Sequence, residues 1–352
     1  MKIHLLSGFL GSGKTTAIHH ASLALLKQGI KTGVITNDQG IKLVDGDFFK
    51  SLDIPGRQVV NGCFCCNYND LEDNIQSLID TNATEVIFAE SVGSCTDIVA
   101  TVLKPLLRSR PEAQVTVSVF ADARLLQMIL TDGANLFDEP VNYIYLKQLE
   151  EAGIIVINKI DLLSDTALAE IKNMMQDKYG NKILLYQTSL NQESIQQWLD
   201  TLDSYKSAGK LSSLGIDYDI YAEGEARLAW FDQELEIYSS TNNALRETEE
   251  LINEIYKKIK QEGYAIGHLK FLINGNIKIS FTSKEQPATA IKPEPSILAK
   301  LLINLRLQSK PGIVKELIAK AIEELEIQSG CKVIVNSLSA FQPGYPVPTY
   351  RI

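Results

Sequence analysis

The sequence Gly8-Phe9-Leu10-Gly11-Ser12-Gly13-Lys14-Thr15, followed by Thr16, decides the fold of this chain. Two glycines that enclose four free positions, followed by Lys and a hydroxyl residue, form the pattern of a phosphate-binding loop. Residues 3–6 precede it as a predicted buried strand, and residues 16–27 follow it as a predicted helix. A glycine turn without a ligand is the alternative interpretation, but the complete pattern favours phosphate binding.

Each part of this loop has a physical role. Gly8, Gly11, Ser12 and Gly13 let the backbone wrap closely and direct its N–H groups at phosphate oxygens. The helix N-terminus adds the positive end of its dipole. Lys14 can reach the β- and γ-phosphates, and the Thr15 hydroxyl can bind Mg²⁺. With Thr16, these residues predict a site for a nucleoside triphosphate.

Composition limits the classes of protein that remain. The 352 residues suggest two domains, and 45% hydrophobic with 22% charged residues is ordinary for a globular chain. The net charge of -9 argues against a general binder of nucleic acid or of anionic membranes. No apolar run approaches the roughly 20 residues that cross a bilayer, and the first strand leaves no room for a signal peptide. We therefore expect a cytoplasmic protein.

Two further predicted strands end in polar residues that suit a nucleotide site. Residues 31–36 lead to Asn37-Asp38-Gln39-Gly40, where carboxylate and amide groups can meet Mg²⁺ or a γ-phosphate. The polar stretch that follows, around Asp45, is expected to be mobile. The local sequence leaves a plain turn and a nucleotide-sensing switch equally open.

The strand predicted over residues 85–90 ends in Glu90, and Gly93 follows. Glu90 can hold the Mg²⁺ shell or orient the attacking water, and the Gly93 N–H can sense the γ-phosphate. Cys95, a single cysteine, is expected to pack rather than to bind a ligand.

The strand predicted over residues 153–157 delivers Asn158-Lys159-Ile160-Asp161. The Asp161 carboxylate can accept hydrogen bonds from N1–H and the 2-amino group of guanine, a donor pair that adenine lacks. The Lys159 stem can cover the base, Asn158 can join loops, and Ser189 lies in a plausible backbone cradle. This order of motifs favours GTP and argues against the alternative of an ATPase or small-molecule kinase.

Three of the five cysteines fall within four positions: Cys63, Cys65 and Cys66. An odd, crowded set does not suit a disulfide framework, whereas soft thiolates favour Zn²⁺ or a similar metal. Successive strand residues face opposite ways, so the three sulfurs can converge only from an irregular loop. Three ligands would leave a fourth position open. Buried small side chains and redox chemistry are the alternatives.

The order of elements predicts the fold class. Alternating strands and helices indicate an α/β domain, a doubly wound, mostly parallel sheet over residues 1–205. Residues 206–225 read as a linker. Residues 226–352 read as a smaller α+β domain, a ferredoxin-like unit with an extra strand, in which Asn274-Gly275 marks a hairpin. His268 in one of its strands is expected to be structural.

Taken together, the chain resembles the CobW-like metal-trafficking GTPases, relatives of the GTPases that help nickel into urease and hydrogenase. The resemblance covers both domains and rests on these motifs: Gly8–Thr16, Asn37-Asp38-x-Gly40 with Asp45, Asn61-Gly62-Cys63-Phe64-Cys65-Cys66, Glu90-x-x-Gly93, Gln148-Leu149-Glu150, Asn158-Lys159-x-Asp161, and the tail Phe341-Gln342-Pro343-Gly344-Tyr345-Pro346-Val347-Pro348-Thr349-Tyr350-Arg351.

The resemblance implies slow hydrolysis of GTP to GDP and phosphate, and we expect Lys14, Glu90 and Asp38 to carry it. It also implies delivery of a divalent metal, most often Zn²⁺ or Co²⁺, to a client metalloprotein or a cofactor-biosynthesis enzyme, and it allows a homodimer. Ile41 stands where family members often carry an acidic residue, which leaves Asp38 as the nearby carboxylate. With only four histidines, metal storage is not expected.

The mechanism that follows is a hypothesis. GTP with Mg²⁺ would fix one arrangement of the cysteine loop, and hydrolysis would change its metal affinity. A rival hypothesis is a GTP-dependent chaperone that assembles or protects a corrinoid enzyme or another metalloenzyme, in which the cysteines are secondary.

Overall fold

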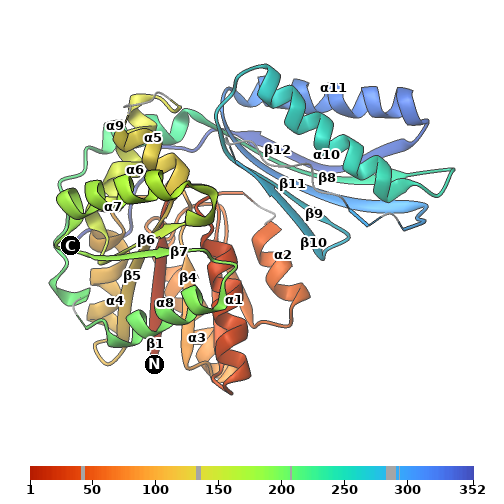
Figure 1. Cartoon of the computed structure of the whole chain (residues 1–352). Coiled ribbons are helices and arrows are strands. Elements are labelled where there is room, and N and C mark those ends of the chain that lie inside the picture. The colour runs from red at the N-terminus through yellow and green to blue at the C-terminus, as the bar shows by residue number, and fades with distance from the viewer. Residues whose placement is uncertain (41–43, 132–135, 207, 283–290, 293) are drawn as a thin grey trace. The chain divides into compact units, whose positions relative to one another are not determined.

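The computed structural model describes residues 1–40, 44–131, 136–206, 208–282, 291–292 and 294–352, which form two compact units. Unit 1 comprises Met1–Gln39, Leu52–Gly224 and Tyr345–Ile352, and unit 2 comprises Gly40–Ser51 and Glu225–Gly344. Each unit contains one sheet (Figure 1). This division differs from the predicted boundaries by assigning residues 40–51 to unit 2 and residues 345–352 to unit 1.

The sheet of unit 1 has seven parallel strands in the order β3-β2-β4-β1-β5-β6-β7, which confirms the predicted doubly wound class. The strands are β1 (Lys2–Ser7), β2 (Thr32–Asn37), β3 (Gly56–Val59), β4 (Val86–Glu90), β5 (Gln114–Asp122), β6 (Ile154–Asn158) and β7 (Ile183–Gln187). β2, β4 and β6 are buried along their whole length, as expected where helices cover both faces of a parallel sheet. The chain leaves β1 toward β2 on one side and β5 toward β6 on the other, so ligands are expected at the carboxyl ends of β1 and β5.

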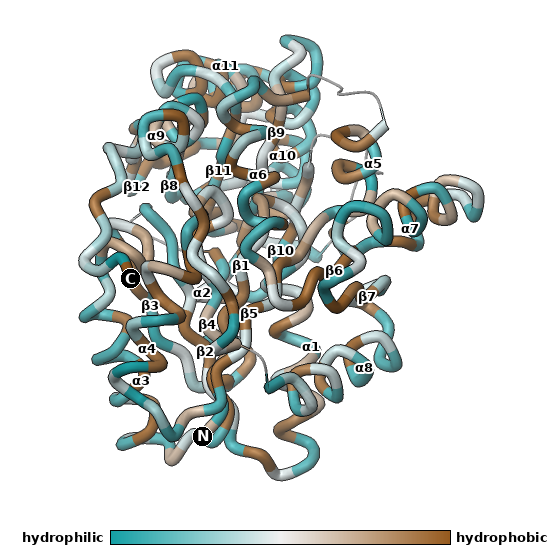
Figure 2. Tube along the Cα trace, turned by 90° about the vertical axis from the view of Figure 1, so that its left-hand side faces the viewer, coloured by the Kyte–Doolittle hydropathy of each residue, from teal (hydrophilic) through white to brown (hydrophobic). Residues whose placement is uncertain are grey.

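The helices of unit 1 alternate with these strands. They are α1 (Lys14–Lys27), α3 (Tyr68–Asn82), α4 (Lys104–Ser109), α5 (Ala123–Thr131), α6 (Glu139–Glu151), α7 (Asp165–Tyr179), α8 (Gln192–Ser204) and α9 (Tyr218–Ala226). Their hydropathy alternates along the chain, as Figure 2 shows for α7, because one side of each helix packs inward. Two differences from the sequence analysis stand out. A π-helical turn, Val99–Leu103, which the sequence did not indicate, precedes α4, and α9 occupies most of the second half of the predicted linker.

Unit 2 is an antiparallel five-stranded sheet with two long helices, as predicted. Its elements are β8 (Leu228–Tyr238), α10 (Ala244–Gln261), β9 (Ile266–Ile273), β10 (Ile277–Phe281), β11 (Leu298–Gln308), α11 (Pro311–Ser329) and β12 (Lys332–Phe341), and the sheet order is β10-β9-β11-β8-β12. Without β10 this is the βαββαβ order of a ferredoxin-like unit, so β10 is the extra strand. Asn274 and Gly275 have φ of 50° and 80°, the conformation of a type I′ hairpin turn.

The stretch that was predicted to be mobile is instead helix α2 (Val44–Ser51), which belongs to unit 2. Val44 is fully buried beside Leu272 and Leu302 of the sheet, and the Asp45 carboxylate pairs with Lys270 and Lys278. A polar local composition did not reveal these contacts because both lysines lie more than 200 positions away. Ile41 lies outside the described residues.

No helix in the described parts of the chain combines the length and the apolar character needed to cross a membrane.

Candidate nucleotide and metal site

The glycine loop lies between β1 and α1, at the carboxyl edge of the sheet. Gly8, Gly11 and Gly13 have φ of 126°, 73° and 92°, values that a residue with a side chain rarely adopts. A Cβ on Gly8 would strike the backbone of Phe120 in β5, and one on Gly13 would strike the Asn158 side chain. The glycines are therefore required by both conformation and space, and Ser12 between them is buried.

Lys14 and Thr15 begin α1 and face this loop. The Lys14 ammonium donates to the Gly8 carbonyl at 2.5 Å and to the Phe9 carbonyl at 3.4 Å. The Thr15 hydroxyl lies 2.9 and 3.0 Å from the two oxygens of Glu90 at the end of β4. A hydroxyl and a carboxylate side by side are hard oxygen ligands that fit Mg²⁺. Thr16, the next residue of the helix, is half-buried.

The predicted guanine motif is joined to the glycine loop by direct hydrogen bonds. The Asn158 amide donates to the Ser12 carbonyl at 2.8 Å, and its oxygen accepts from the N–H and hydroxyl of Ser189 at 3.0 and 2.9 Å. Lys159, in the left-handed region with φ of 64°, donates to the Gly11 carbonyl at 2.6 Å. The structure thus brings the phosphate loop and the predicted base-binding loops into one site.

Two residues complete the base-binding side. The Asp161 carboxylate accepts from the Thr188 hydroxyl at 2.6 Å and is exposed. Asp122, which the sequence analysis did not single out, ends β5 and pairs with Lys159 at 2.8 Å. Burial alone would raise the pKa of Asp122, but Lys159 and Arg124 outweigh it and lower that pKa. A carboxylate at a strand end was the signal that could have found it.

Gly93 packs against the glycine loop, since a Cβ there would meet Leu10. The Gln148 side chain donates to the carbonyls of Gly93 and Cys95 at 3.1 and 2.8 Å. Gln148 is almost fully buried, so α6 fixes the segment that follows Glu90. These contacts give a structural role to Gln148, the first residue of the Gln148-Leu149-Glu150 motif noted in the sequence.

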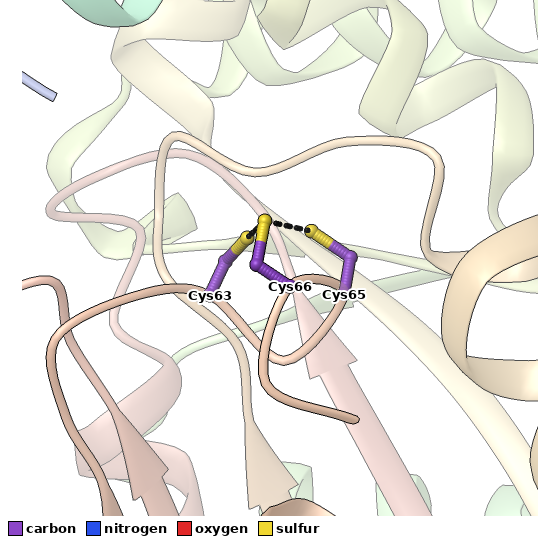
Figure 3. A group of neighbouring side chains, drawn as sticks. All are labelled: Cys63, Cys65 and Cys66. Carbon is purple, nitrogen blue, oxygen red and sulfur yellow. Dashed lines mark hydrogen bonds between the residues drawn. The ribbon is translucent and has the colours of Figure 1, made fainter. Parts of the chain in front are cut away.

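The three clustered cysteines converge from an irregular loop, as predicted. Their sulfurs all lie within 4.8 Å of one another, with 3.3 Å between Cys63 and Cys66 and 3.7 Å between Cys65 and Cys66 (Figure 3). The loop turns sharply because Asn61 and Gly62 have positive φ and the Cys63 carbonyl accepts the N–H groups of Cys66 and Asn67. Cys63 and Cys65 are buried and Cys66 is half-buried.

The thiols differ in their tendency to ionise. Hydrogen bonds from neighbouring thiols lower the pKa of Cys63 well below its usual value. The hydrogen bond to the Cys63 sulfur raises the pKa of Cys66 to about 11, and the pKa of Cys65 is raised for the same reason. Of the three thiols, Cys63 therefore loses its proton most readily, and the thiolate is the form that binds metals and reacts.

Asn37, at the end of β2, ties the cysteine loop to the sheet. Its side-chain NH₂ donates to the carbonyls of Val59 and Gly62 at 3.0 and 2.7 Å, and its oxygen accepts from the Phe64 N–H at 2.8 Å. These contacts occupy an amide that the sequence suggested could meet Mg²⁺ or a γ-phosphate. Asp38 follows it, half-buried, and its N–H donates to the Val59 carbonyl at 3.2 Å. Gly40 belongs to unit 2, where a Cβ would strike the buried Asp232.

The segment Tyr345–Ile352 returns to unit 1 and lies on the cysteine loop. The Thr349 N–H donates to the Cys65 carbonyl at 2.8 Å, and its hydroxyl donates to the Cys66 carbonyl at 2.8 Å. The Arg351 guanidinium pairs with Asp97 at 2.8 Å. The cysteine loop is thus held from one side by Asn37 and from the other by this segment.

Comparisons with known proteins give a consistent result. Residues 2–184 match the family described as "CobW/HypB/UreG, nucleotide-binding domain". The zinc chaperone CobW of Sinorhizobium sp is 26% identical over 200 residues, which cover 51% of this chain and 56% of that protein. The zinc chaperone YeiR of Escherichia coli (strain K12) is 25% identical over 188 residues, which cover 53% of this chain and 54% of that protein. The chain therefore spans about half the length of these curated relatives.

Among solved structures, the fold matches "HypB from Helicobacter pylori in complex with nickel" with a TM-score of 0.45 and 17% identity. That match covers 61% of this chain and 91% of the other.

Proposed function

The chain belongs to the CobW/HypB/UreG family, and from this premise we propose that it is a GTP-hydrolysing metallochaperone. It would hold a divalent transition metal, Zn²⁺ or Co²⁺, through Cys63, Cys65 and Cys66. It would deliver that metal to a client metalloprotein or to an enzyme of cofactor biosynthesis. The curated relatives that match it are named zinc chaperones, which favours Zn²⁺ as the cargo.

Recognition of GTP is supported by the base-binding side of the site. The Asp161 carboxylate is exposed and held by Thr188, so its oxygens can accept the N1–H and 2-amino donors of guanine. Asn158 and Lys159 join this side to the glycine loop. Loss of either contact would loosen the connection between the base-binding side and the glycine loop.

Hydrolysis would depend on Lys14, Glu90 and Asp38. Lys14 would neutralise the β- and γ-phosphates, because its ammonium already lies within the loop that would surround them. Thr15 and Glu90 would hold Mg²⁺, which supplies charge neutralisation at the phosphates when bound. Glu90 or Asp38 would orient the attacking water, and Gly93 beside the loop would contact the γ-phosphate.

The observation that carries the proposal is the contact between the predicted nucleotide switch, residues 37–40, and the loop that bears Cys63, Cys65 and Cys66. Asn37 stands next to Asp38 and makes three hydrogen bonds to the segment that bears the cysteines. A shift of Asp38 between the GTP and GDP states would therefore move the cysteine loop. A nucleotide can change metal affinity only through such a difference between the two states.

The test is the dissociation constant for Zn²⁺, measured by chelator competition on the full chain with a non-hydrolysable GTP analogue and with GDP. We expect a difference of about tenfold, which corresponds to a coupling free energy of about 1.4 kcal/mol. Equal constants would contradict the coupling. Cys331→Ala serves as a control, because Cys331 belongs to the core of unit 2 and should leave both constants unchanged.

The alternative is a GTP-dependent chaperone that assembles or protects a corrinoid enzyme or another metalloenzyme without transferring metal. Replacing Cys63, Cys65 and Cys66 by Ser separates the two proposals. Activation of a client would fail under metal delivery and persist under the alternative. The compact group of three sulfurs favours delivery.

A further inference from the structure

Asp122 divides its two carboxylate oxygens between a helix and the predicted guanine motif. One oxygen accepts the N–H groups of Arg124 and Leu125 at 2.9 and 3.3 Å, which caps the N-terminus of α5. The other oxygen accepts from the Lys159 ammonium at 2.8 Å and lies 3.5 Å from the Arg124 guanidinium. This one side chain therefore joins α5 to the loop that follows β6.

The register of the sheet places Asp122 beside the guanine motif. Asp122 is the last residue of β5, and its partner in the parallel neighbour β6 is Asn158, the first residue of Asn158-Lys159-x-Asp161. Both strands end at the same edge of the sheet, where ligands of such folds bind. The contact between Asp122 and the next residue of the motif, Lys159, thus follows from strand pairing.

The Lys159 side chain is held by acceptors from two different elements. Besides the Asp122 carboxylate, its ammonium reaches the Gly11 carbonyl at 2.6 Å. A Cβ built on Gly13 would lie 3.9 Å from the Lys159 Cε, so the stem runs beside the glycine loop. The Lys159 backbone has a φ of 64°, a conformation that a residue with a side chain keeps only where its surroundings determine it.

Capping of α5 does not by itself explain a carboxylate at this position. Asp122 is 5% exposed, and a buried carboxylate costs free energy unless it is paired. A neutral Asn would cap the helix as well. The negative charge is explained by the second oxygen, which pairs with Lys159 and lies near Arg124.

We propose that Asp122 is a positioning residue for guanine nucleotides, which fixes the Lys159 side chain so that its stem covers the base recognised by Asp161. This inference rests on the proposed function, since it assumes that Asn158-Lys159-x-Asp161 binds the guanine of GTP. Asp122 acts through Lys159 and needs no contact with the nucleotide. A lysine that is already fixed loses less side-chain entropy when the nucleotide binds, and this raises the affinity.

The experiment is Asp122→Asn in the full chain, with GTP and GDP affinities measured by titration. The amide oxygen still caps α5, but the NH₂ group faces the Lys159 ammonium, and two donors cannot pair. We expect both affinities to fall about tenfold or more, because a charge-assisted hydrogen bond is lost. The two losses should be equal, since GTP and GDP share the base. A loss confined to GTP would place the effect at the γ-phosphate and overturn the inference.

Lys159→Met tests whether Asp122 acts through Lys159, because it removes the ammonium and keeps an unbranched stem. It should lose about as much GTP affinity as Asp122→Asn, and the test therefore does not depend on whether Asp122→Asn folds. In the Lys159→Met background, Asp122→Asn should cause no further loss, because the pairing that it breaks is already gone. Equal losses in both backgrounds, or parent affinity in either single variant, would overturn the inference.

Asp217→Asn is the matched control. The Asp217 carboxylate caps α9 in the same way, since it accepts the N–H groups of Asp219 and Ile220 at 3.0 and 3.2 Å. This variant should keep the parent affinities, and urea unfolding verifies that each variant is folded. A parent chain that binds no GTP would overturn the proposed function. A parent that binds GTP, with Asp122→Asn binding it equally well, would overturn only the role of Asp122.

Discussion

At the scale of single residues, the Asp161 carboxylate offers the most direct change to test. Replacing it by Asn puts an NH₂ donor or a single carbonyl where guanine presents two donors. We expect Asp161→Asn to weaken GTP binding about a hundredfold or more and to improve binding of xanthosine triphosphate, whose 2-oxo group can accept from the amide. Nucleotide titration measures both affinities. Asp177→Asn, at an exposed position of α7, is the control, and equal GTP affinity in the two variants would contradict the assignment.

Glu151 provides a prediction about pH. Burial, with help from Asp97, raises the pKa of this carboxyl to about 8, against a usual value of 4.5. Between those two values the unfolded chain has lost a proton that the folded chain retains. The free energy of unfolding should therefore fall as pH rises through this window, by at most about 1.4 kcal/mol per pH unit from this group.

Glu151→Gln keeps one acceptor oxygen, for the Val99 N–H, and places an NH₂ group beside the Thr96 hydroxyl, which can turn to accept from it. The amide cannot ionise, so the variant should remove that slope. Urea unfolding at pH 6 and pH 8 measures the effect, and the variant should lose less stability than the parent between them. Glu193→Gln, at an exposed position in the first turn of α8, should behave like the parent. If the parent and Glu151→Gln lost the same amount of stability between pH 6 and pH 8, the Glu151 carboxyl would not titrate in that range.

The sequence predicted residues whose function is local, and the reason is physical. The glycine loop, Asn158–Asp161 and the three clustered cysteines are recognisable because their spacing determines their geometry. The contacts by which Asn37 holds the cysteine loop were not predicted. The hydrogen-bond partners of Asn37 lie 22 to 27 positions away, and no periodicity reports which side chains meet after folding.

At the scale of elements, the joint between β2 and the cysteine loop is the critical connection. Asn37→Ala removes two hydrogen bonds to that loop and one to Val59 at the end of β3, and it leaves the cysteines in place. We expect Zn²⁺ affinity to fall about tenfold or more and the difference between the GTP-analogue and GDP states to shrink. Chelator competition in both states measures this change.

Asn74→Ala is the matched control, because the Asn74 amide makes one hydrogen bond from α3 to Gln58 and none is found to the cysteines. If Asn37→Ala kept the parent affinities in both nucleotide states, the loop would not depend on β2, and the coupling would require another route.

Elements were easier to predict than their irregularities. Buried strands were recognised from their apolar runs because both faces of the sheet of unit 1 are covered. The π-helical turn at Val99–Leu103 was not, because it depends on tertiary contacts. Glu151 meets the Val99 N–H, and Ile352 donates to the Ala100 carbonyl. Such contacts come from distant segments and leave no local pattern.

At the scale of the whole molecule, helix α2 belongs to unit 2 although the strands before and after it in sequence belong to unit 1. Burial alone would raise the pKa of Asp45, but Lys270 and Lys278 outweigh it and hold the pKa well below the usual value. Asp45→Asn would remove the carboxylate that pairs with both Lys270 and Lys278. We expect it to destabilise unit 2 by about 3 kcal/mol at pH 7.

The sign of the pH dependence follows from the lowered pKa of Asp45. The ionised Asp45 carboxylate contributes to the free energy of unfolding above its usual pKa of 3.8. That contribution is lost as pH falls below this value. The parent and Asp45→Asn should therefore differ less in their free energy of unfolding at acidic pH than at neutral pH. Urea unfolding at the two pH values measures this change. Glu250→Gln, in an exposed pair with Arg246, should change stability by less than about 1 kcal/mol. An equally small effect of Asp45→Asn would show that α2 is held by Val44 alone.

The fold class of both units was predictable, but the assignment of segments to them was not. The order of strands and helices was sufficient to predict a parallel sheet followed by a ferredoxin-like unit. Residues 40–51 and 345–352 belong to the unit that is distant in sequence, and their attachments depend on Asp45 and Thr349. Only the folded structure shows these pairs.

This interlaced path of the backbone has a consequence for how such proteins can be divided. The chain passes from one unit to the other after Gln39, Ser51, Gly224 and Gly344, so no single peptide bond separates them. A fragment that stops at Gly224 would keep Cys63, Cys65 and Cys66 but lose the hydrogen bonds from Thr349 to their loop. Exchange of one half for that of a relative, by recombination or by a protein engineer, would have to preserve two short inserted segments as well.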